Sequence, residues 1–226
     1  MSSKPVEGYT KSAMATDLKS LLDHLSIHDK VHVVGHDIGG MIAWAFATRH
    51  SEHTASVVWG ECPLPGTRFM DECRSVNSVQ KFHFIFHSVP DVPEALVSGR
   101  EDIYLRHFYA NEGYKPNAMS PEDIDYYVQM YRRPGALRCA FNVYRSFLED
   151  IKENREWIAK HAKCTVKALS LNSAMSTHTA AAEGMMAEAH EPGTFTMAKI
   201  PDSGHYLAEE NPEGFNKAIL EFIEQD

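Results

Sequence analysis

The stretch of the chain that decides the fold reads Val31-His32-Val33-Val34-Gly35-His36-Asp37-Ile38-Gly39-Gly40. Its first residues are β-branched and almost free of charge, which predicts a short, buried strand over Val31 to Gly35. The next segment, Met41 to His50, is rich in alanine and aromatic residues and predicts a helix. Because glycines flank the aspartate, the backbone can double back between strand and helix without a Cβ clash. The turn therefore lifts Asp37 above the sheet edge, where the amino end of the helix stabilises its carboxylate.

Two simpler interpretations of this turn stay open from these residues alone. In the first, Asp37 is only the N-cap of a helix in a doubly wound sheet. In the second, the glycines form a phosphate-binding loop. The second is weaker, because the stretch contains no Gly-x-Gly-x-x-Gly and no Lys-Ser/Thr follows the glycines.

Composition and charge restrict the class of protein. The 226 residues include 22 basic and 31 acidic side chains, and the net charge of −9 disfavours nucleic acid and anionic membranes as partners. The 13 histidines are scattered, and neither Cys-x-x-Cys nor His-Glu-x-x-His occurs, so we expect no metal and no cofactor. No apolar segment resembles a signal peptide or reaches membrane length, so we expect a cytoplasmic protein. The cysteines are far apart and fit reduced thiols: Cys62, Cys73, Cys139 and Cys164.

The order of the predicted elements indicates a parallel sheet with a helical insertion. Thr10 caps a predicted helix, and a second strand is predicted over Ala55 to Gly60, so helix and strand alternate. From Pro63 to Lys163 the pattern is mostly helical. The alternation then returns, with strands predicted over Thr165 to Leu171 and Gly193 to Ile200, and helices over Ala180 to His190 and from Asn211-Pro212 onward.

Three helix signals divide the insertion. One helix is predicted from Asp91 to Asn111. A second begins at Ser120-Pro121, where serine is a good cap and proline suits the first turn. Pro134 opens the third, which carries apolar residues at Leu137, Phe141, Tyr144 and Phe147.

The turn around Asp37 resembles the nucleophile elbow of the α/β-hydrolase family. Aspartate at its centre, in place of serine, points to the branch that forms alkyl-enzyme esters, the epoxide hydrolases and dehalogenases. A second stretch, Gly204-His205-Tyr206-Leu207-Ala208-Glu209-Glu210-Asn211-Pro212, resembles the catalytic-histidine segment of that family. The resemblance implies Asp37 as the nucleophile and His205 as the base that activates water to cleave the ester. The alternative for His205 is a surface histidine that caps a helix.

The family places the acid that orients this histidine at one of two strand ends. The later position lies in Leu171-Asn172-Ser173-Ala174-Met175, which has no carboxylate. The earlier position holds Glu61, so the resemblance implies Glu61 as the acid. The alternative is a solvated glutamate at a strand end. Glu183 is a weaker candidate, because helical spacing places it away from the strand end.

The insertion resembles the lid of the Cif-like epoxide hydrolases. In that subgroup a lid histidine and a lid tyrosine hold the epoxide oxygen, and His83 and Tyr144 match those two segments. Such donors are needed because charge develops on the ring oxygen as the C–O bond breaks. Aromatic packing alone is the alternative role for both residues. The neighbouring side chains predict an apolar substrate pocket lined by Phe82, Phe84 and Phe141.

The resemblance implies a hydrolase that opens a small epoxide to a vicinal diol through an alkyl ester on Asp37. A haloacetate or haloalkane dehalogenase uses the same aspartate chemistry and is the alternative. Haloacetate dehalogenases bind their substrate with arginines beside the nucleophile and a tryptophan in the lid. This chain has Ile38, Met41 and Phe84 at those places. Since no cation flanks Asp37, an uncharged epoxide is favoured.

The resemblance starts in the middle of the family pattern. The family's first four strands and its His-Gly-x-Pro segment have no counterpart here, which leaves the Ile38 N–H as the expected oxyanion-hole donor. We therefore expect a partial α/β-hydrolase fold, with a core over residues 1–62 and 164–226 and a helical lid over 63–163. The strand at Val31 to Gly35 would then have an unpaired apolar edge, which favours self-association. A truncated, catalytically inactive remnant of the family is the third hypothesis.

Overall fold

The computed structural model describes residues 3–75, 81–176 and 178–224. Its sheet has four parallel strands in the order β1-β2-β3-β4. They are β1 (Val31–His36), β2 (Thr54–Gly60), β3 (Ala168–Ser173) and β4 (Phe195–Ile200). The predicted parallel sheet is confirmed, although β3 begins and ends later in the chain than predicted.

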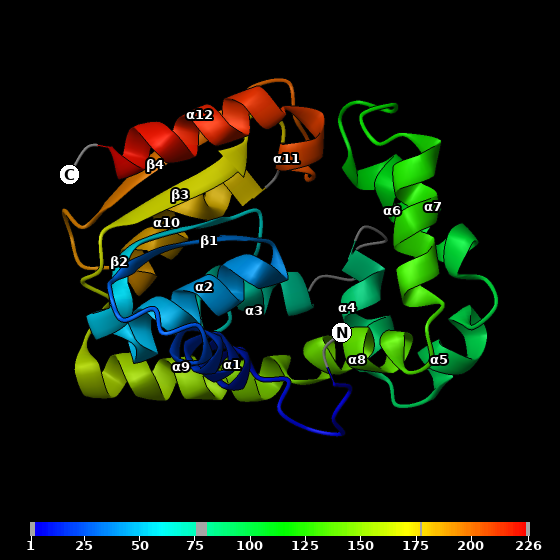
Figure 1. Ribbon diagram of the computed structural model, residues 1–226, viewed down its shortest axis with the longest axis horizontal. Helices are drawn as coiled ribbons and strands as arrows, with labels where there is room; N and C mark the ends of the chain where they lie inside the picture. Colours follow the sequence, from blue (N-terminus) through cyan, green and yellow to red (C-terminus); the bar gives the residue numbers. More distant parts are fainter. Residues whose placement is uncertain (1–2, 76–80, 177, 225–226) are drawn as a thin grey trace.

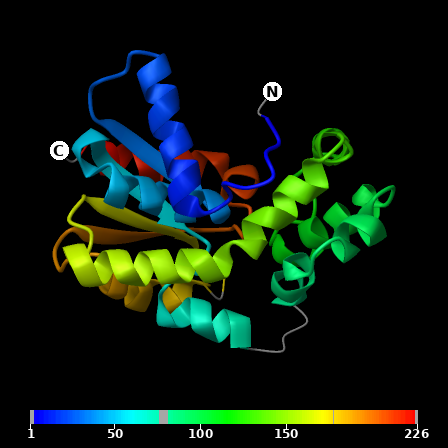
Figure 2. The ribbon, with the colours of Figure 1, turned by 90° about the horizontal axis from the view of Figure 1, so that it is seen from below.

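Helices cover both faces of the sheet (Figures 1 and 2). α2 (Ile38–Arg49), α9 (Phe147–His161) and α10 (His178–Ala189) lie on one face, and α12 (Pro212–Ile223) lies on the other. α1 (Lys11–His24) packs beside α2, and Thr10 caps it as predicted. Three shorter elements complete this part of the molecule: η1 (Ser51–His53), α3 (Arg68–Ser75) and α11 (Leu207–Glu210).

The strand side chains alternate between two apolar layers, because successive residues of a strand point to opposite faces. Val57 and Trp59 of β2 pack into the layer that α2, α9 and α10 cover. Val58, between them, packs with Leu169 and Phe222 on the α12 face. The sheet is thus buried on both sides along β2 and β3, which holds the carboxyl ends of these strands in place.

β1 forms one edge of the described sheet and is less buried than predicted. Val31 and Val33 pack against α1 and α2, but Val34 on the opposite face is 42% exposed. The prediction of a buried strand is wrong for Val34, because α12 covers the inner strands and not this edge. Within the described residues, no strand pairs with the outer edge of β1. Self-association through that edge stays a prediction.

Five helices from the middle of the chain gather at the carboxyl ends of the strands (Figure 1). Together they form one wall that faces the sheet, and we refer to these five helices as the lid helices. They are α4 (Phe82–Ser88), α5 (Val92–Val97), α6 (Glu101–Glu112), α7 (Pro121–Tyr131) and α8 (Ala136–Arg145).

Local signals set the ends of these helices. Ser120 caps α7, and Ser120 and Asp123 form a reciprocal capping box with the backbone N–H groups of each other. The single helix predicted from Asp91 to Asn111 is wrong. The chain forms α5 and α6 instead, with Gly99 between them at a φ of +78°, a conformation that interrupts a helix and suits glycine.

α9 lies in the stretch predicted as lid but packs under the sheet (Figure 2). Trp157 of α9 meets Trp44 of α2 edge-on, with ring centroids 6.1 Å apart. The Asn154 Oδ1 of α9 accepts a hydrogen bond of 2.7 Å from the Arg49 guanidinium. The division of the chain into a core (1–62 and 164–226) and a lid (63–163) stays a prediction.

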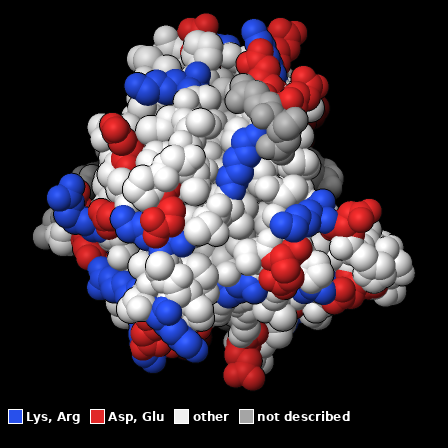
Figure 3. Space-filling model, turned by 90° about the vertical axis from the view of Figure 1, so that its left-hand side faces the viewer, with Lys and Arg blue, Asp and Glu red and all other residues white. Residues whose placement is uncertain are grey.

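The surface carries mixed charge on the side away from the lid helices. Figure 3 shows lysine and arginine interspersed with aspartate and glutamate on that face. Such a mixture gives no extended field of one sign there. Across the described ranges, each helix is too short or too polar to serve as a membrane span.

A buried ion pair joins α1 to the junction of α8 and α9. Lys11 Nζ lies 2.6 Å from Asp150 Oδ2 and donates to Val143 O (2.7 Å) and Ser146 Oγ (3.0 Å). Burial lowers the pKa of Lys11, and the Asp150 carboxylate opposes that shift. Val143 and Ser146 bracket Tyr144, so this network fixes the backbone on both sides of that tyrosine.

Replacement of Lys11 by methionine should destabilise the fold strongly, because Asp150 would stay buried without its partner. We expect a loss of about 3–5 kcal/mol in the free energy of unfolding, measured by urea denaturation. The control is Lys19→Met, which removes a lysine from the same helix whose partner, Asp23, is exposed. Its cost should be far smaller. Equal effects of the two substitutions would contradict this assignment.

Candidate functional site

A sharp turn between β1 and α2 presents Asp37. Its φ is +51°, and its N–H donates to Gly60 O of the neighbouring strand end at 3.1 Å. A Cβ at Gly35 would lie 2.1 Å from Gly39 O, so the turn requires glycine there. Asp37 occupies the N-cap position of α2, but its side chain makes no capping hydrogen bond. The carboxylate is instead 35% exposed and lines a cavity.

Glu61 follows β2 in a similar turn, with a φ of +54°, and is fully buried. Its Oε1 accepts the Ser173 N–H at 2.7 Å, and its own N–H donates to Asn172 Oδ1 at 2.9 Å. Burial would raise the pKa of Glu61, but hydrogen bonds from His178 and His205 hold it far below its usual value. Glu61 is therefore an ionised, internally bound carboxylate and not a solvated strand end.

His205 lies between these two carboxylates. Its Nδ1 is 3.4 Å from Glu61 Oε2, and its Nε2 is 4.0 Å from Asp37 Oδ2. The backbone of His205 is held on both sides: its N–H donates to Glu112 O at 2.9 Å, and its carbonyl accepts His36 Nε2 at 2.6 Å. The turns after β1 and β2 and the loop after β4 thus meet at one imidazole.

The carboxylates around His205 make it more basic. Burial would lower the pKa of this imidazole, but the hydrogen bond to Glu61 and the charges of Asp37 and Glu112 raise it above the ordinary value of 6.5. An imidazole in this setting is chemically able to take a proton from a water molecule, since a neighbouring carboxylate stabilises an imidazolium.

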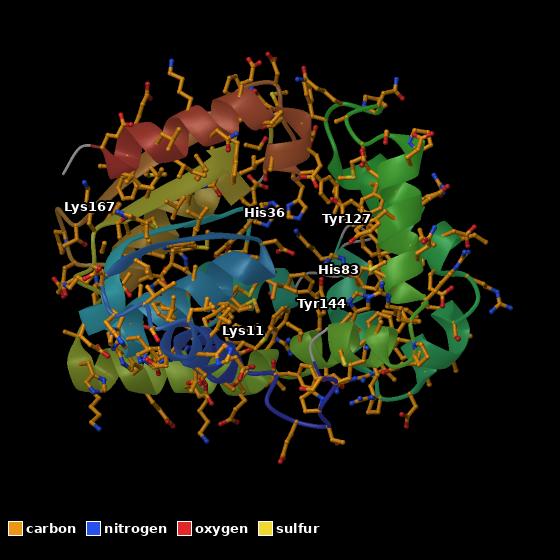
Figure 4. The ribbon with its side chains drawn as sticks, in the orientation of Figure 1. Lys11, His36, His83, Tyr127, Tyr144 and Lys167 are labelled. Carbon is orange, nitrogen blue, oxygen red and sulfur yellow. The ribbon has the colours of Figure 1, made fainter. Side chains whose placement is uncertain are left out.

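His83 and Tyr144 face the site from the lid helices α4 and α8. Their rings meet edge-on with centroids 5.8 Å apart, and Figure 4 places both on the lid side, with His36 on the core side. Burial lowers the pKa of His83 to about 4. Burial raises the pKa of Tyr144 well above 10, and the Asp37 charge adds to that shift. Tyr144 therefore keeps its proton at neutral pH and can donate a hydrogen bond.

A cavity of about 500 Å³ separates the core from the lid helices. Asp37, Glu61, His205, His83 and Tyr144 all line it. So do the three predicted substrate-binding side chains, Phe82, Phe84 and Phe141.

Ile38, the predicted oxyanion-hole residue, is the first residue of α2. Its side chain packs against the core, and its N–H is one of those at a helix start that have no intrahelical acceptor. Among the described residues, no group of three or more His, Cys, Asp or Glu side chains is arranged to hold a metal ion.

Sequence reasoning missed three site residues. The His178 Nδ1 lies 3.5 Å from Glu61 Oε2, so this carboxylate serves two imidazoles. Glu112 Oε2 lies 3.9 Å from His205 Nε2. Tyr131 lines the cavity, and burial raises its pKa. No local sequence motif marks any of the three, because they reach the cavity only through the docking of α6, α7 and α10 against the strand ends.

Glu210 ties the lid to the loop of His205. Its Oε2 accepts the N–H groups of Tyr114 (2.6 Å) and Lys115 (2.8 Å) in the segment after α6. Its Oε1 accepts those of Gly204 (2.9 Å) and Tyr206 (3.1 Å), on both sides of His205. Four backbone donors thus converge on one buried carboxylate and hold the two segments together.

Comparison with known proteins identifies relatives of this chain. The model of the Alpha/beta hydrolase family matches residues 2–218. The soluble epoxide hydrolase of Corynebacterium sp. (strain C12) is 32% identical over 228 residues, which cover 98% of this chain and 76% of that protein. Human epoxide hydrolase 4 is 26% identical, over 97% of this chain and 60% of that protein. The chain thus spans three fifths to three quarters of the length of these two relatives.

Solved structures also resemble the fold of this chain. Epoxide hydrolase CorEH without ligand superimposes with a TM-score of 0.85 and 27% identity, over 99% of this chain and 77% of that chain. Wild-type Cfl2 from Burkholderia cenocepacia gives a TM-score of 0.87 and 26% identity, over 97% of this chain and 74% of that chain.

Glu210→Gln should loosen the link between lid and histidine loop, because an amide NH₂ group would face two N–H donors. We expect a loss of about 1–3 kcal/mol in the free energy of unfolding. Amide exchange should become faster at Tyr114, Lys115, Gly204 and Tyr206, as measured by NMR or mass spectrometry. Glu209→Gln is the control, since Glu209 is exposed and its Oε1 accepts a hydrogen bond from the Tyr127 hydroxyl. Unchanged exchange in Glu210→Gln would refute this role.

Glu61→Gln should lower the pKa of His205, because the substitution removes the anion that stabilises the imidazolium. In the wild type we expect the NMR titration of His205 to have its midpoint above 6.5. An activity that needs neutral His205 increases as the pH rises through that midpoint. In Glu61→Gln the midpoint is lower, so the remaining activity should reach half of its maximum at a lower pH than in the wild type. The opposite shift, or none, would show that Glu61 does not act on His205.

Proposed function

The chain belongs to the alpha/beta hydrolase family, and on this premise we propose that it is an epoxide hydrolase that forms a vicinal diol through an alkyl ester on Asp37. The observation that carries the proposal is the position of one imidazole between two carboxylates: His205 Nδ1 is 3.4 Å from Glu61 and Nε2 is 4.0 Å from Asp37. The names of the relatives support the epoxide as substrate.

In the first step, an Asp37 oxygen attacks an epoxide carbon and the C–O bond of the ring breaks. The ring oxygen becomes an alkoxide that must receive a proton. Tyr144 is suited to donate this proton, because burial keeps its hydroxyl protonated. His83 lies beside it and is suited to donate a hydrogen bond to the same oxygen. The product of this step is an ester between Asp37 and the opened substrate.

In the second step, water cleaves the ester. His205 Nε2 takes a proton from water, and the hydroxide attacks the carbonyl carbon of the Asp37 ester. The separation of 4.0 Å is too long for a direct hydrogen bond, so Nε2 stays available to a water molecule. In this mechanism the Ile38 N–H is the donor to the developing oxyanion, and Glu61 stabilises the imidazolium. The ester C–O bond then breaks, and the proton of the new Asp37 carboxyl passes to the leaving alkoxide to give the diol. The proton held by His205 returns through water to Tyr144, so Asp37, His205 and Tyr144 are restored.

The cavity supports an apolar or aromatic epoxide as substrate. Its wall carries Phe82, Phe84 and Phe141 with few charged groups. An aromatic ring of the substrate would gain contact area and edge-to-face packing against these side chains. The haloacetate alternative requires a cation beside the nucleophile, and the first turn of α2 supplies none.

The test is to trap the ester in a His205→Gln variant. After incubation with styrene oxide, we expect the intact mass to increase by one substrate molecule, because the ester forms but water is not activated. Diol formation should fall by about 10²–10⁴-fold relative to the wild type. The matched control is Asp37→Asn/His205→Gln, which should show no increase in mass.

Other outcomes decide against the proposal. Halide release from chloroacetate without diol from any epoxide would assign the chain to the dehalogenases. A folded wild-type protein that forms neither adduct nor product with either substrate would favour the inactive remnant. An adduct that persists in the Asp37→Asn control would show that another residue is the nucleophile.

A further inference from the structure

A second carboxylate faces the imidazole nitrogen that the proposed mechanism uses. Glu112 is the last residue of α6, and its side chain lines the cavity. Its Oε2 lies 3.9 Å from His205 Nε2, and Asp37 Oδ2 lies 4.0 Å from the same nitrogen. The two-step reaction described above uses Asp37 as the nucleophile and gives Glu112 no contact with the substrate.

The backbone holds Glu112 firmly in this place. Its carbonyl accepts the His205 N–H at 2.9 Å, and the segment that follows is bound by Glu210. A Cβ at Gly204 would lie 2.8 Å from Glu112 O, so the two chain segments are in close contact. The backbone of Glu112 is therefore a fixed part of the cavity wall, although its side chain is still 28% exposed.

The charges that line the cavity do not balance near the nucleophile. Glu61 has two imidazoles as partners, His205 and His178. Among the described residues, the contacts of Asp37 and Glu112 within ion-pair distance both go to the outer nitrogen of His205. Lys81 also lines the cavity, and its Nζ lies 5.8 Å from the Phe84 ring centroid. The part of the cavity wall formed by Asp37 and Glu112 thus carries an excess of negative charge.

We propose that Glu112 selects the charge of the substrate: with Asp37 it repels epoxides that carry an anionic group next to the ring, and it attracts epoxides that carry an ammonium group there. The inference rests on the proposed epoxide chemistry and narrows its substrate class to neutral and cationic epoxides. The physical cause is the Coulomb interaction of a charge a few ångströms from a half-buried carboxylate.

The test compares kcat/KM for three small epoxides that differ in charge: glycidate, methyl glycidyl ether and glycidyltrimethylammonium. In Glu112→Gln we expect kcat/KM to rise about tenfold for glycidate and to fall about tenfold for the ammonium compound, mainly through KM. The three constants are measured at a pH above the titration of His205, where the loss of the Glu112 charge no longer changes the protonation of this imidazole. There the uncharged ether should change less than threefold. Glu156→Gln removes the same charge from an exposed position on α9 and should change none of the three.

Two kinetic outcomes would overturn the inference. An equal fall in kcat for all three epoxides would show that Glu112 acts on the hydrolytic water or on His205. Unchanged constants in a variant that melts like the wild type would show that Glu112 does not face the substrate.

A binding measurement separates this inference from the proposed reaction. Calorimetry with benzyltrimethylammonium and benzoate needs no turnover, and Glu112→Gln should weaken binding of the cation about tenfold relative to benzoate. If no epoxide is opened but this shift is seen, the proposed reaction fails and the charge selection stands. If epoxides are opened and the shift is absent, the charge selection fails alone.

Discussion

One imidazole held between two carboxylates is the interaction on which the site depends. Both carboxylates follow strand ends in turns with positive φ, +51° at Asp37 and +54° at Glu61, and the neighbouring order of β1 and β2 brings these turns together. His205 joins them from the loop after β4, with its two ring nitrogens directed to different acids. The parallel sheet therefore determines the geometry of the site, because it places three loops at one edge.

The lid helices are held to this edge by polar links as well as by aromatic packing. Glu210 binds backbone groups of both the lid and the histidine loop, and Lys11 with Asp150 fixes the junction beside Tyr144. These buried charges are costly to desolvate, and each is matched by several partners. The position of the lid donors relative to Asp37 thus depends on groups outside the cavity.

The sequence predicted the features that local patterns encode. The strand and turn around Asp37, the cap at Ser120 and the parallel sheet follow from glycine spacing, capping residues and alternation. The break at Gly99 and the exposure of Val34 depend on a single φ angle and on which helix covers which strand. Glu112 and His178 could not be found, because only the docking of distant segments places them beside His205 and Glu61. The roles of the predicted site residues stay predictions.

Isotope labelling tests the central claim, that Asp37 itself supplies an oxygen to the product. The enzyme is used in excess over styrene oxide, in water enriched in ¹⁸O, so that each site turns over once. We expect a diol without ¹⁸O and one ¹⁸O atom in the peptide that contains Asp37, because water attacks the carbonyl carbon of the ester. A first-turnover diol that carries ¹⁸O, with unlabelled Asp37, would contradict it.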